Sequence, residues 1–138
     1  MATIRLLYYS EATKEMSLAD LKEILGTARD NNSSQDICGM LCYDNQFFLQ
    51  VLEGDSEEVS ELFIKIGQDV RHDRVAIMSV QQIEKPAFQN WQMGYAGSSE
   101  LLQSLLQELN LDAFEPDKLT PKQAAEILYK LSKSQTEV

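Results

Sequence analysis

Residues 37–54 read ICGMLCYDNQFFLQVLEG, two apolar runs joined by a short polar segment. The runs Ile37–Tyr43 and Phe47–Glu53 are rich in aromatic and aliphatic side chains, as buried strands are. Asp44-Asn45 predicts a turn, and so short a connection predicts an antiparallel hairpin. Gln50 stands near the middle of the second run, although both faces of that strand are otherwise apolar. A buried amide without a partner costs about 1–3 kcal/mol, so we expect Gln50 to be hydrogen-bonded.

Strand and helix patterns alternate on both sides of this hairpin. Strands are predicted at Ile4–Ser10 and Val75–Ile83, with a short one after Met93. A Ser17/Asp20 capping box precedes one helix, and an Asp55/Glu58 box precedes a second. The predicted buried face of the second helix consists of Val59, Leu62, Phe63, Ile66 and Val70. Two further helices follow, a leucine stripe at 101–109 and a helix that starts at Thr120-Pro121 and buries Ile127, Leu128 and Leu131.

The order βαββαββ followed by two helices predicts an α+β protein with a ferredoxin-like sheet. Crossovers of one hand place the first two helices on one face of that sheet. The C-terminal helix pair is then free to cover the other face. We expect residues 1–97 to form the main domain, 98–133 a helical pair within the same compact unit, and 134–138 a frayed tail.

The composition restricts the class of protein. The chain has 138 residues and a formal net charge of −10, which favours one domain and disfavours direct binding to nucleic acids or anionic membranes. With no membrane-length apolar run and no signal-peptide pattern, we expect a cytoplasmic protein. Cys38 and Cys42 would lie about 13 Å apart on one strand, beyond the roughly 7 Å that a disulfide allows. No zinc spacing occurs, so no metal site is expected.

Three polar residues occupy positions where apolar ones are expected. Gln50 lies in a strand, Asn32 continues the apolar stripe of the first helix, and Tyr8 shares a strand face with Leu6 and Ser10. Each fits an ordinary structural role: an amide bonded to backbone, an asparagine that ends a helix, or a core tyrosine with its hydroxyl satisfied. In this topology the strands of Tyr8 and Gln50 are neighbours beneath the first helix. Periodicity therefore permits the three to converge on a pocket for a planar heterocycle.

Taken together, several motifs resemble the BLUF domains, blue-light sensors that use FAD. They are RLLYYS at 5–10, NN at 31–32, the 37–54 hairpin, QDVRHDR at 68–74 and FQNWQM at 88–93. The chain looks most like the short members, in which only two helices follow. The resemblance implies a photoreceptor rather than an enzyme that turns over a substrate. It also implies FAD as cofactor, with FMN or riboflavin as substitutes.

The resemblance further implies roles for single residues. Tyr8 would give an electron to the photoexcited flavin with coupled proton transfer, and Gln50 would bridge Tyr8 and the flavin N5/C4=O edge. Whether the amide rotates or tautomerises stays open. Asn32, with Asn31 beside it, would bond the pyrimidine side of the ring. The remaining implied residues are Ile24, Phe48, Lys65, Arg71 and His72 for cofactor binding, and Trp91 and Met93 for signal output.

Some of these positions also suit a protein that binds no cofactor, or depart from the family pattern. Arg71, His72 and Arg74 follow the predicted second helix, where its dipole favours cations whether or not a cofactor is bound. Position 28 is Ala where some relatives have Ser, and Lys65 replaces an Arg, which makes a bidentate phosphate contact less available.

Output is expected to pass through another chain, because no catalytic or DNA-binding pattern follows residue 97. Resemblance to short BLUF proteins implies a homo-oligomer and a separate effector, such as a response-regulator-like protein. The helices at 101–109 and 121–131 are candidate surfaces, although packing on the sheet also accounts for their leucines. Two other functions stay open, a flavin-binding regulator without photochemistry and a small-molecule hydrolase on a ferredoxin-like scaffold.

Overall fold

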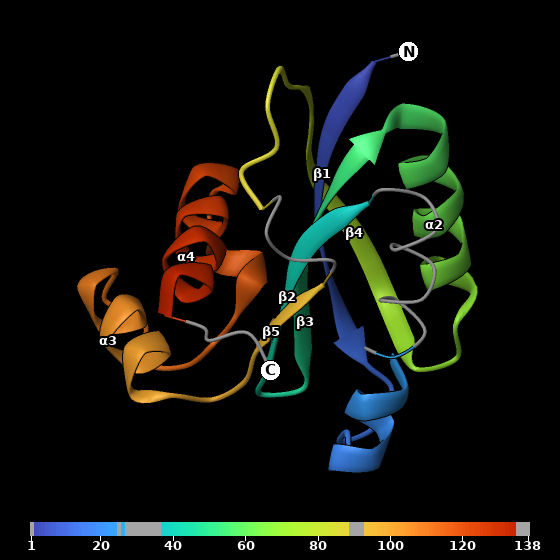
Figure 1. Ribbon diagram of the computed structural model, residues 1–138. Coiled ribbons are helices and arrows are strands. Elements are labelled where there is room, and N and C mark those ends of the chain that lie inside the picture. The colour runs from blue at the N-terminus through green and yellow to red at the C-terminus, as the bar shows by residue number, and fades with distance from the viewer. Residues whose placement is uncertain (1, 25, 27–36, 89–92, 135–138) are drawn as a thin grey trace.

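The computed structural model describes residues 2–24, 26, 37–88 and 93–134, and these form one five-stranded sheet between two helical layers (Figure 1). The strand order is β4-β1-β3-β2-β5, with antiparallel neighbours except for the parallel pair β2–β5. The strands are β1 (Thr3–Ala12), β2 (Cys38–Asp44), β3 (Phe47–Asp55), β4 (His72–Gln82) and β5 (Gly94–Ala96). The labelled helices are α2 (Ser56–Gln68), α3 (Glu100–Glu108), the short 3₁₀ helix η1 (Pro116–Lys118) and α4 (Pro121–Ser134). Residues 18–24 are also helical.

The predicted helix starts are confirmed by their capping bonds. Ser17 and Asp20 exchange backbone-to-side-chain hydrogen bonds before helical residues 18–24, and Thr120 and Gln123 do the same at α4. Asp55 accepts from two backbone N–H groups of the first turn of α2. Each cap satisfies donors that the first turn of a helix leaves without an intrahelical partner.

Some predicted boundaries are wrong. The hairpin turn is Asn45-Gln46 rather than Asp44-Asn45. Both residues have positive φ, as a two-residue type I′ turn requires. Helix α2 ends at Gln68 because the next residue is extended. Val70 therefore lies outside the helix and is 85% exposed, rather than on its buried face. Strand β1 continues past its predicted end at Ser10, and β4 begins before its predicted start at Val75, because Ala12 pairs with His72.

The sheet separates two cores, and the alternation predicted for β3 is confirmed. Leu49 and Val51 pack with residues of α3 and α4 on one face. Phe48 and Leu52 pack with α2 and with Leu21 of the helical segment 18–24 on the other. Figure 1 shows α2 on one side of the sheet and α3 with α4 on the opposite side. The ferredoxin-like arrangement, with the C-terminal pair on the second face, is therefore confirmed.

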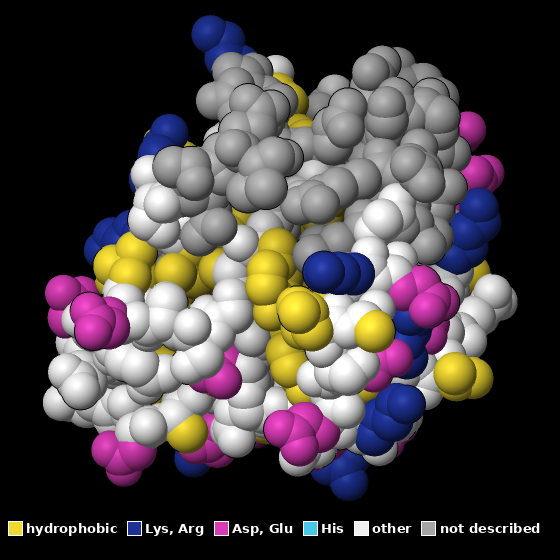
Figure 2. Space-filling view, turned by 60° about the horizontal axis from the view of Figure 1, so that its bottom comes forward, with side chains coloured by type: hydrophobic (Ala, Val, Ile, Leu, Met, Phe, Trp, Pro, Cys, Tyr) yellow, Lys and Arg dark blue, Asp and Glu magenta, His cyan; other side chains and the backbone are white. Residues whose placement is uncertain are grey.

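The structure also bears on the expectations for the two cysteines, the C-terminal tail, membrane-spanning segments and surface charge. Cys38 and Cys42 are free and buried. Ser134 is the last residue of α4, and the rest of the expected tail, 135–138, lies outside the described residues. Within the described ranges, no helix combines the length and apolar character needed to cross a membrane. On the face shown in Figure 2, Lys and Arg side chains are scattered among Asp and Glu rather than gathered into one basic patch.

Candidate functional site

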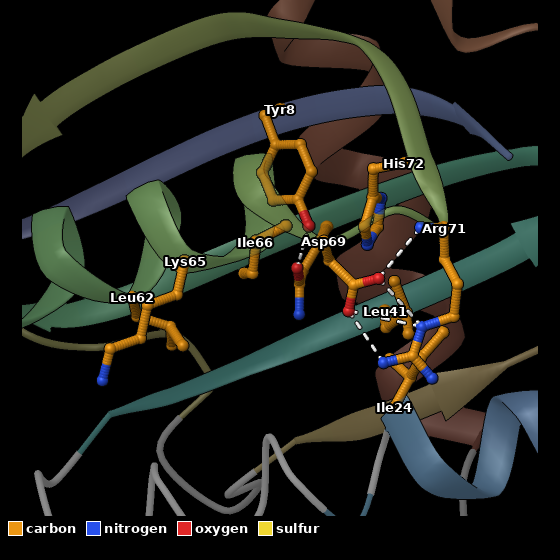
Figure 3. A pocket seen from close by; sticks show the side chains of 10 residues that line it. Tyr8, Ile24, Leu41, Leu62, Lys65, Ile66, Asp69, Arg71 and His72 are labelled. Carbon is orange, nitrogen blue, oxygen red and sulfur yellow. Dashed lines mark hydrogen bonds and ion pairs between the residues drawn. The ribbon is translucent and has the colours of Figure 1, made fainter. Parts of the chain in front are cut away.

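A cavity of about 140 Å³ lies on the α2 side of the sheet, and Figure 3 shows the side chains around it. Its floor consists of Tyr8 of β1, Gln50 of β3 and Leu41 of β2, which are direct cross-strand neighbours. The floor therefore follows from strand register, because residues opposite one another on adjacent strands share a face. The surrounding residues are Ile24, Leu62, Lys65, Ile66, Asp69, Arg71 and His72.

A buried hydrogen bond joins two floor residues. The hydroxyl of Tyr8 donates to Oε1 of Gln50. Tyr8 is 0% exposed and Gln50 is 4% exposed, so this bond is shielded from solvent. Burial raises the pKa of Tyr8 well above its usual 10, and the negative charge of Asp69 acts in the same direction. The phenol therefore keeps its proton at neutral pH and remains a donor.

The other end of the Gln50 amide contacts the segment before β5. Its Nε2 donates to Sδ of Met93 at 3.3 Å. Met93 is 2% exposed and immediately precedes β5. A thioether is a weak acceptor, so this bond holds the amide less firmly than the one to Tyr8. Of the two expected output residues, Met93 packs inward beside Gln50, and Trp91 lies outside the described residues.

An ion pair at the rim fixes Arg71. Its Nε and Nη2 atoms donate to the carboxylate of Asp69 at 3.0 and 2.7 Å, and its backbone N–H donates to the same group at 2.9 Å. Figure 3 draws these bonds at one end of the cavity. Hydrogen bonding to Arg71 is the main reason that the pKa of Asp69 is lowered. Glu23 lies 3.6 Å from Arg71 Nη1 and adds a second negative charge.

His72 lies between the cavity and the core beneath it. Its Nδ1 is 2.7 Å from Oγ of Ser10, and its ring centroid is 4.5 Å from that of Phe48. Burial lowers the pKa of His72, while Asp69 partly opposes this and Arg71 adds to it. The imidazole is therefore held in its neutral form more strongly than a histidine in water.

The cavity brings together most of the site residues expected from the sequence. Those that line it are Tyr8, Ile24, Gln50, Lys65, Arg71 and His72. Phe48 lies in the core beneath, against His72, and does not line the cavity itself. The expected residues Asn31 and Asn32 lie outside the described residues.

Sequence reasoning missed four residues that line the cavity: Leu41, Leu62, Ile66 and Asp69. The periodicity identified the first three as buried but not as parts of a cavity. Asp69 could have been predicted from the sequence, because an acidic residue directly after a helix and two positions before an arginine can hold that arginine in place.

These residues fit a flavin. The apolar side chains of Ile24, Leu62 and Ile66 can contact the faces of a flat ring, and the amide of Gln50 offers both a donor and an acceptor to a polar ring edge. Lys65 adds an exposed ammonium group at the wall, which suits an anionic substituent. The flavin ring system has this combination of apolar faces and one hydrogen-bonding edge.

Two family models match the chain. The model of BLUF, sensors of blue-light using FAD, matches residues 3–94. The model of the C-terminal region of the DNA mismatch repair protein MutS matches residues 102–133. The second match is confined to the region of α3 and α4 and carries no conclusion about function.

Known relatives agree with the first match. Photoactivated adenylate cyclase subunit beta of Euglena longa is 40% identical over 83 residues, which are 60% of this chain and 10% of that protein. The chain thus spans about a tenth of the length of this curated relative. Among solved structures, the photo-activated state of BlsA has a TM-score of 0.91 at 32% identity, with 99% of each chain covered. The dark state of BlrB, a BLUF protein, has a TM-score of 0.82 at 25% identity, covering 97% of this chain and 98% of that one.

A family match over residues 3–94, close similarity to BlsA over nearly all of both chains, and a buried tyrosine–amide pair in a cavity that fits a flavin lead to one conclusion. This chain belongs to the BLUF family of blue-light sensors.

Proposed function

We propose that this chain is a blue-light photoreceptor in which Tyr8 is the electron and proton donor and Gln50 is the switching group. The observation that carries the proposal is the buried hydrogen bond between these two side chains in the floor of a cavity that fits a flavin. FAD is the proposed cofactor, and FMN or riboflavin would present the same ring. The residues proposed to hold it, besides Gln50, are Ile24, Asn31, Asn32, Lys65, Arg71 and His72, with Phe48 supporting the ring of His72 from the core beneath.

A bound flavin would supply the absorption of blue light and an excited state that accepts an electron. Tyr8 holds its proton at rest because burial raises its pKa. Loss of an electron makes a phenol far more acidic, and a buried positive charge is costly. With a flavin bound, the phenolic proton would therefore leave together with the electron, along the existing hydrogen bond to Oε1 of Gln50.

Proton arrival at Oε1 would change what the Gln50 amide offers to its neighbours, and return of the electron and one proton to Tyr8 would leave that change confined to the amide. In the starting arrangement Oε1 accepts from Tyr8 and Nε2 donates to Met93. Rotation of the amide exchanges these two ends, and tautomerisation exchanges their donor and acceptor character. Rotation would turn Oε1 toward the thioether, and tautomerisation would leave the nitrogen with a single N–H and a lone pair. Either rearrangement would therefore alter the contact between β3 and the segment that leads into β5.

Strand β5 is well placed to carry this change away from the cavity. It pairs with β2 through three residues, Gly94 to Ala96, at the edge of the sheet. Ala96 belongs to the core that the sheet shares with α3 and α4. A shift of Met93 would therefore reach the C-terminal helices through β5, a local bonding event with a distant readout.

The proposed output is a change in binding to other chains rather than turnover of a substrate. We propose that the chain self-associates and that a separate effector protein binds the region of α3 and α4. The Euglena longa relative, named a photoactivated adenylate cyclase, supports an arrangement in which light sensing controls an associated activity. Light scattering coupled to size-exclusion chromatography, in darkness and under blue light, measures the oligomeric state and its dependence on light.

Absorption spectroscopy of the FAD-loaded protein tests the photochemical roles. Blue light should produce a small red shift of the flavin band that reverses in darkness. Tyr8→Phe and Gln50→Leu should each retain the flavin and lose this reversible shift. Tyr9→Phe is the matched control, because Tyr9 packs on the opposite face of the sheet and should respond normally. Wild-type responses in both site variants, or a wild-type protein that takes up no flavin, would refute the proposal.

A further inference from the structure

Glu53 is the only charged residue that is fully buried among the described residues, with an exposed fraction of 0%. It lies on β3 three residues after Gln50, so the two side chains point to opposite faces of the sheet. Its direct cross-strand neighbours are Arg5 on β1 and Cys38 on β2. No step of the proposed photochemistry uses this carboxylate.

Both carboxylate oxygens of Glu53 are occupied by donors from three parts of the chain. Arg5 donates to Oε2 through Nε at 2.8 Å and Nη2 at 2.7 Å, and the backbone N–H of Ala87 donates to the same oxygen at 3.1 Å. The backbone N–H of Phe88 donates to Oε1 at 2.8 Å, and Sγ of Cys38 lies 3.7 Å from that oxygen. The carboxylate thus ties two consecutive residues after β4 to the centre of the sheet.

The same segment of chain contacts β3 again at Met93. Phe88 precedes Met93 by five residues, and Met93 accepts from the Gln50 amide on the cavity side. Phe88 is itself buried and packs edge-on against Tyr129 of α4, with ring centroids 6.2 Å apart. Strand β3 therefore holds the β4–β5 connection from both faces, through Glu53 on the α4 side and Gln50 on the cavity side.

We propose that Glu53 is a positioning residue for the light response, because it anchors the segment whose far end contacts the switching amide. The inference rests on the proposed role of Gln50. Return to the dark arrangement must rebuild the contact between Gln50 and Met93. The bonds from Glu53 hold Ala87 and Phe88 in place, so the return of Met93 to Gln50 costs less conformational entropy than it would with these two residues released. Loss of the anchor should therefore slow dark recovery.

Glu53→Gln tests this role with little change in shape. The amide keeps one oxygen as an acceptor but turns an NH₂ group toward a donor and loses the charge that faces Arg5. We expect an unchanged flavin content and dark absorption spectrum, with recovery after blue light slowed about threefold or more, because the released residues must lose conformational entropy before the contact is remade. Cys38→Ala is the matched control, because it removes one donor to the carboxylate and leaves Arg5 and both backbone bonds in place. Its recovery should match that of the wild type.

The measurement separates positioning from a purely structural role. Recovery is followed well below the melting temperature of every variant, so a loss of stability alone would leave the rate unchanged. If Glu53→Gln does not fold, the double variant Arg5→Met/Glu53→Gln removes both charges together and leaves no unpaired buried charge. It should show the same slow recovery.

The failures of the two proposals can be distinguished. A wild-type protein that binds FAD but shows no reversible red shift would overturn the proposed function and this inference with it. A wild-type protein that responds, with unchanged recovery in Glu53→Gln or in the folded double variant, would overturn the role of Glu53 alone.

Discussion

Gln46, in the turn between β2 and β3, has a left-handed backbone conformation that is unfavourable for its residue type. Asn45 and Gln46 have φ angles of 52° and 62°. Asparagine tolerates this left-handed region, but for most other residues the left-handed conformation costs about 1–2 kcal/mol. Glycine would remove that strain and lose about 0.5–1 kcal/mol through its greater freedom in the unfolded chain. We therefore expect Gln46→Gly to raise the free energy of unfolding by about 1 kcal/mol.

Urea denaturation followed by far-UV circular dichroism measures this gain. In a thermal melt of a domain of this size, the same gain of about 1 kcal/mol corresponds to a rise in Tm of about 3–5 °C. All variants are compared at one FAD concentration, because a bound ligand adds to the stability of the folded state. A midpoint that is unchanged or lowered in Gln46→Gly, at an unchanged m-value, would refute the reasoning.

Two matched variants identify the cause of the gain. Gln46→Ala removes the same side chain but keeps the Cβ atom, so its stability should stay within about 0.5 kcal/mol of the wild type. Asn45→Gly gains little because asparagine already accepts positive φ, and it loses the bond from Asn45 Nδ2 to the Phe114 carbonyl at 3.2 Å. We expect Asn45→Gly to be less stable by about 1 kcal/mol.

Two further predictions concern His72 and two glycines. Because the folded-state pKa of His72 lies below its usual 6.5, its contribution to stability should be complete above about pH 6.5 and be lost as the pH falls through the folded-state value. In flavin-free protein the free energy of unfolding should fall across this range, and His72→Phe should remove that part of the slope; equal slopes would contradict the reasoning. Gly39→Ala places a Cβ atom 2.0 Å from the Val51 carbonyl oxygen and should destabilise by about 3 kcal/mol. A Cβ atom added by Gly67→Ala in α2 meets no atom within 4 Å apart from its chain neighbours and the backbone of its own helix, and the change should stabilise by about 0.5–1 kcal/mol. The same denaturation assay should therefore give opposite signs for the two glycines.

Features that depend on local spacing could be predicted from the sequence. The alternation along β3 predicts which side chains share a face, and Phe48 and Leu49 indeed lie in different cores. Capping residues predict where α2 and α4 begin. The end of α2 differs from the prediction. Asp69 has an extended backbone and its carboxylate bonds Arg71, so the helix ends at Gln68 and Val70 is exposed.

Features that depend on distant partners could not be predicted in the same way. Leu41 and Leu62 follow the same pattern as ordinary core residues, and they line a cavity only because of how the helices stand over the sheet. The periodicity of apolar residues does not indicate how far a helix stands from the sheet beneath it. Glu53 ends an apolar run and has the pattern of a polar strand end, yet it is buried because Arg5 and the residues after β4 close over it. The pairing of Tyr8 with Gln50 could be predicted more readily from the sequence, because the topology makes their strands neighbours.

The division of the sheet into two cores also has a consequence for how such a domain can diversify. The side chains that would surround a chromophore and those that support the C-terminal helices belong to separate packing units, although they alternate along one backbone. Because an effector is proposed to bind the region of α3 and α4, we expect substitutions on the outer surface of α4 to change partner binding while the absorption of the bound flavin is retained. Modularity of this kind suits a region whose counterpart makes up about a tenth of a much longer relative. For engineering, we expect partner choice and spectral properties to be adjustable one at a time, with the connection between β4 and β5 as the place where changes to one begin to affect the other.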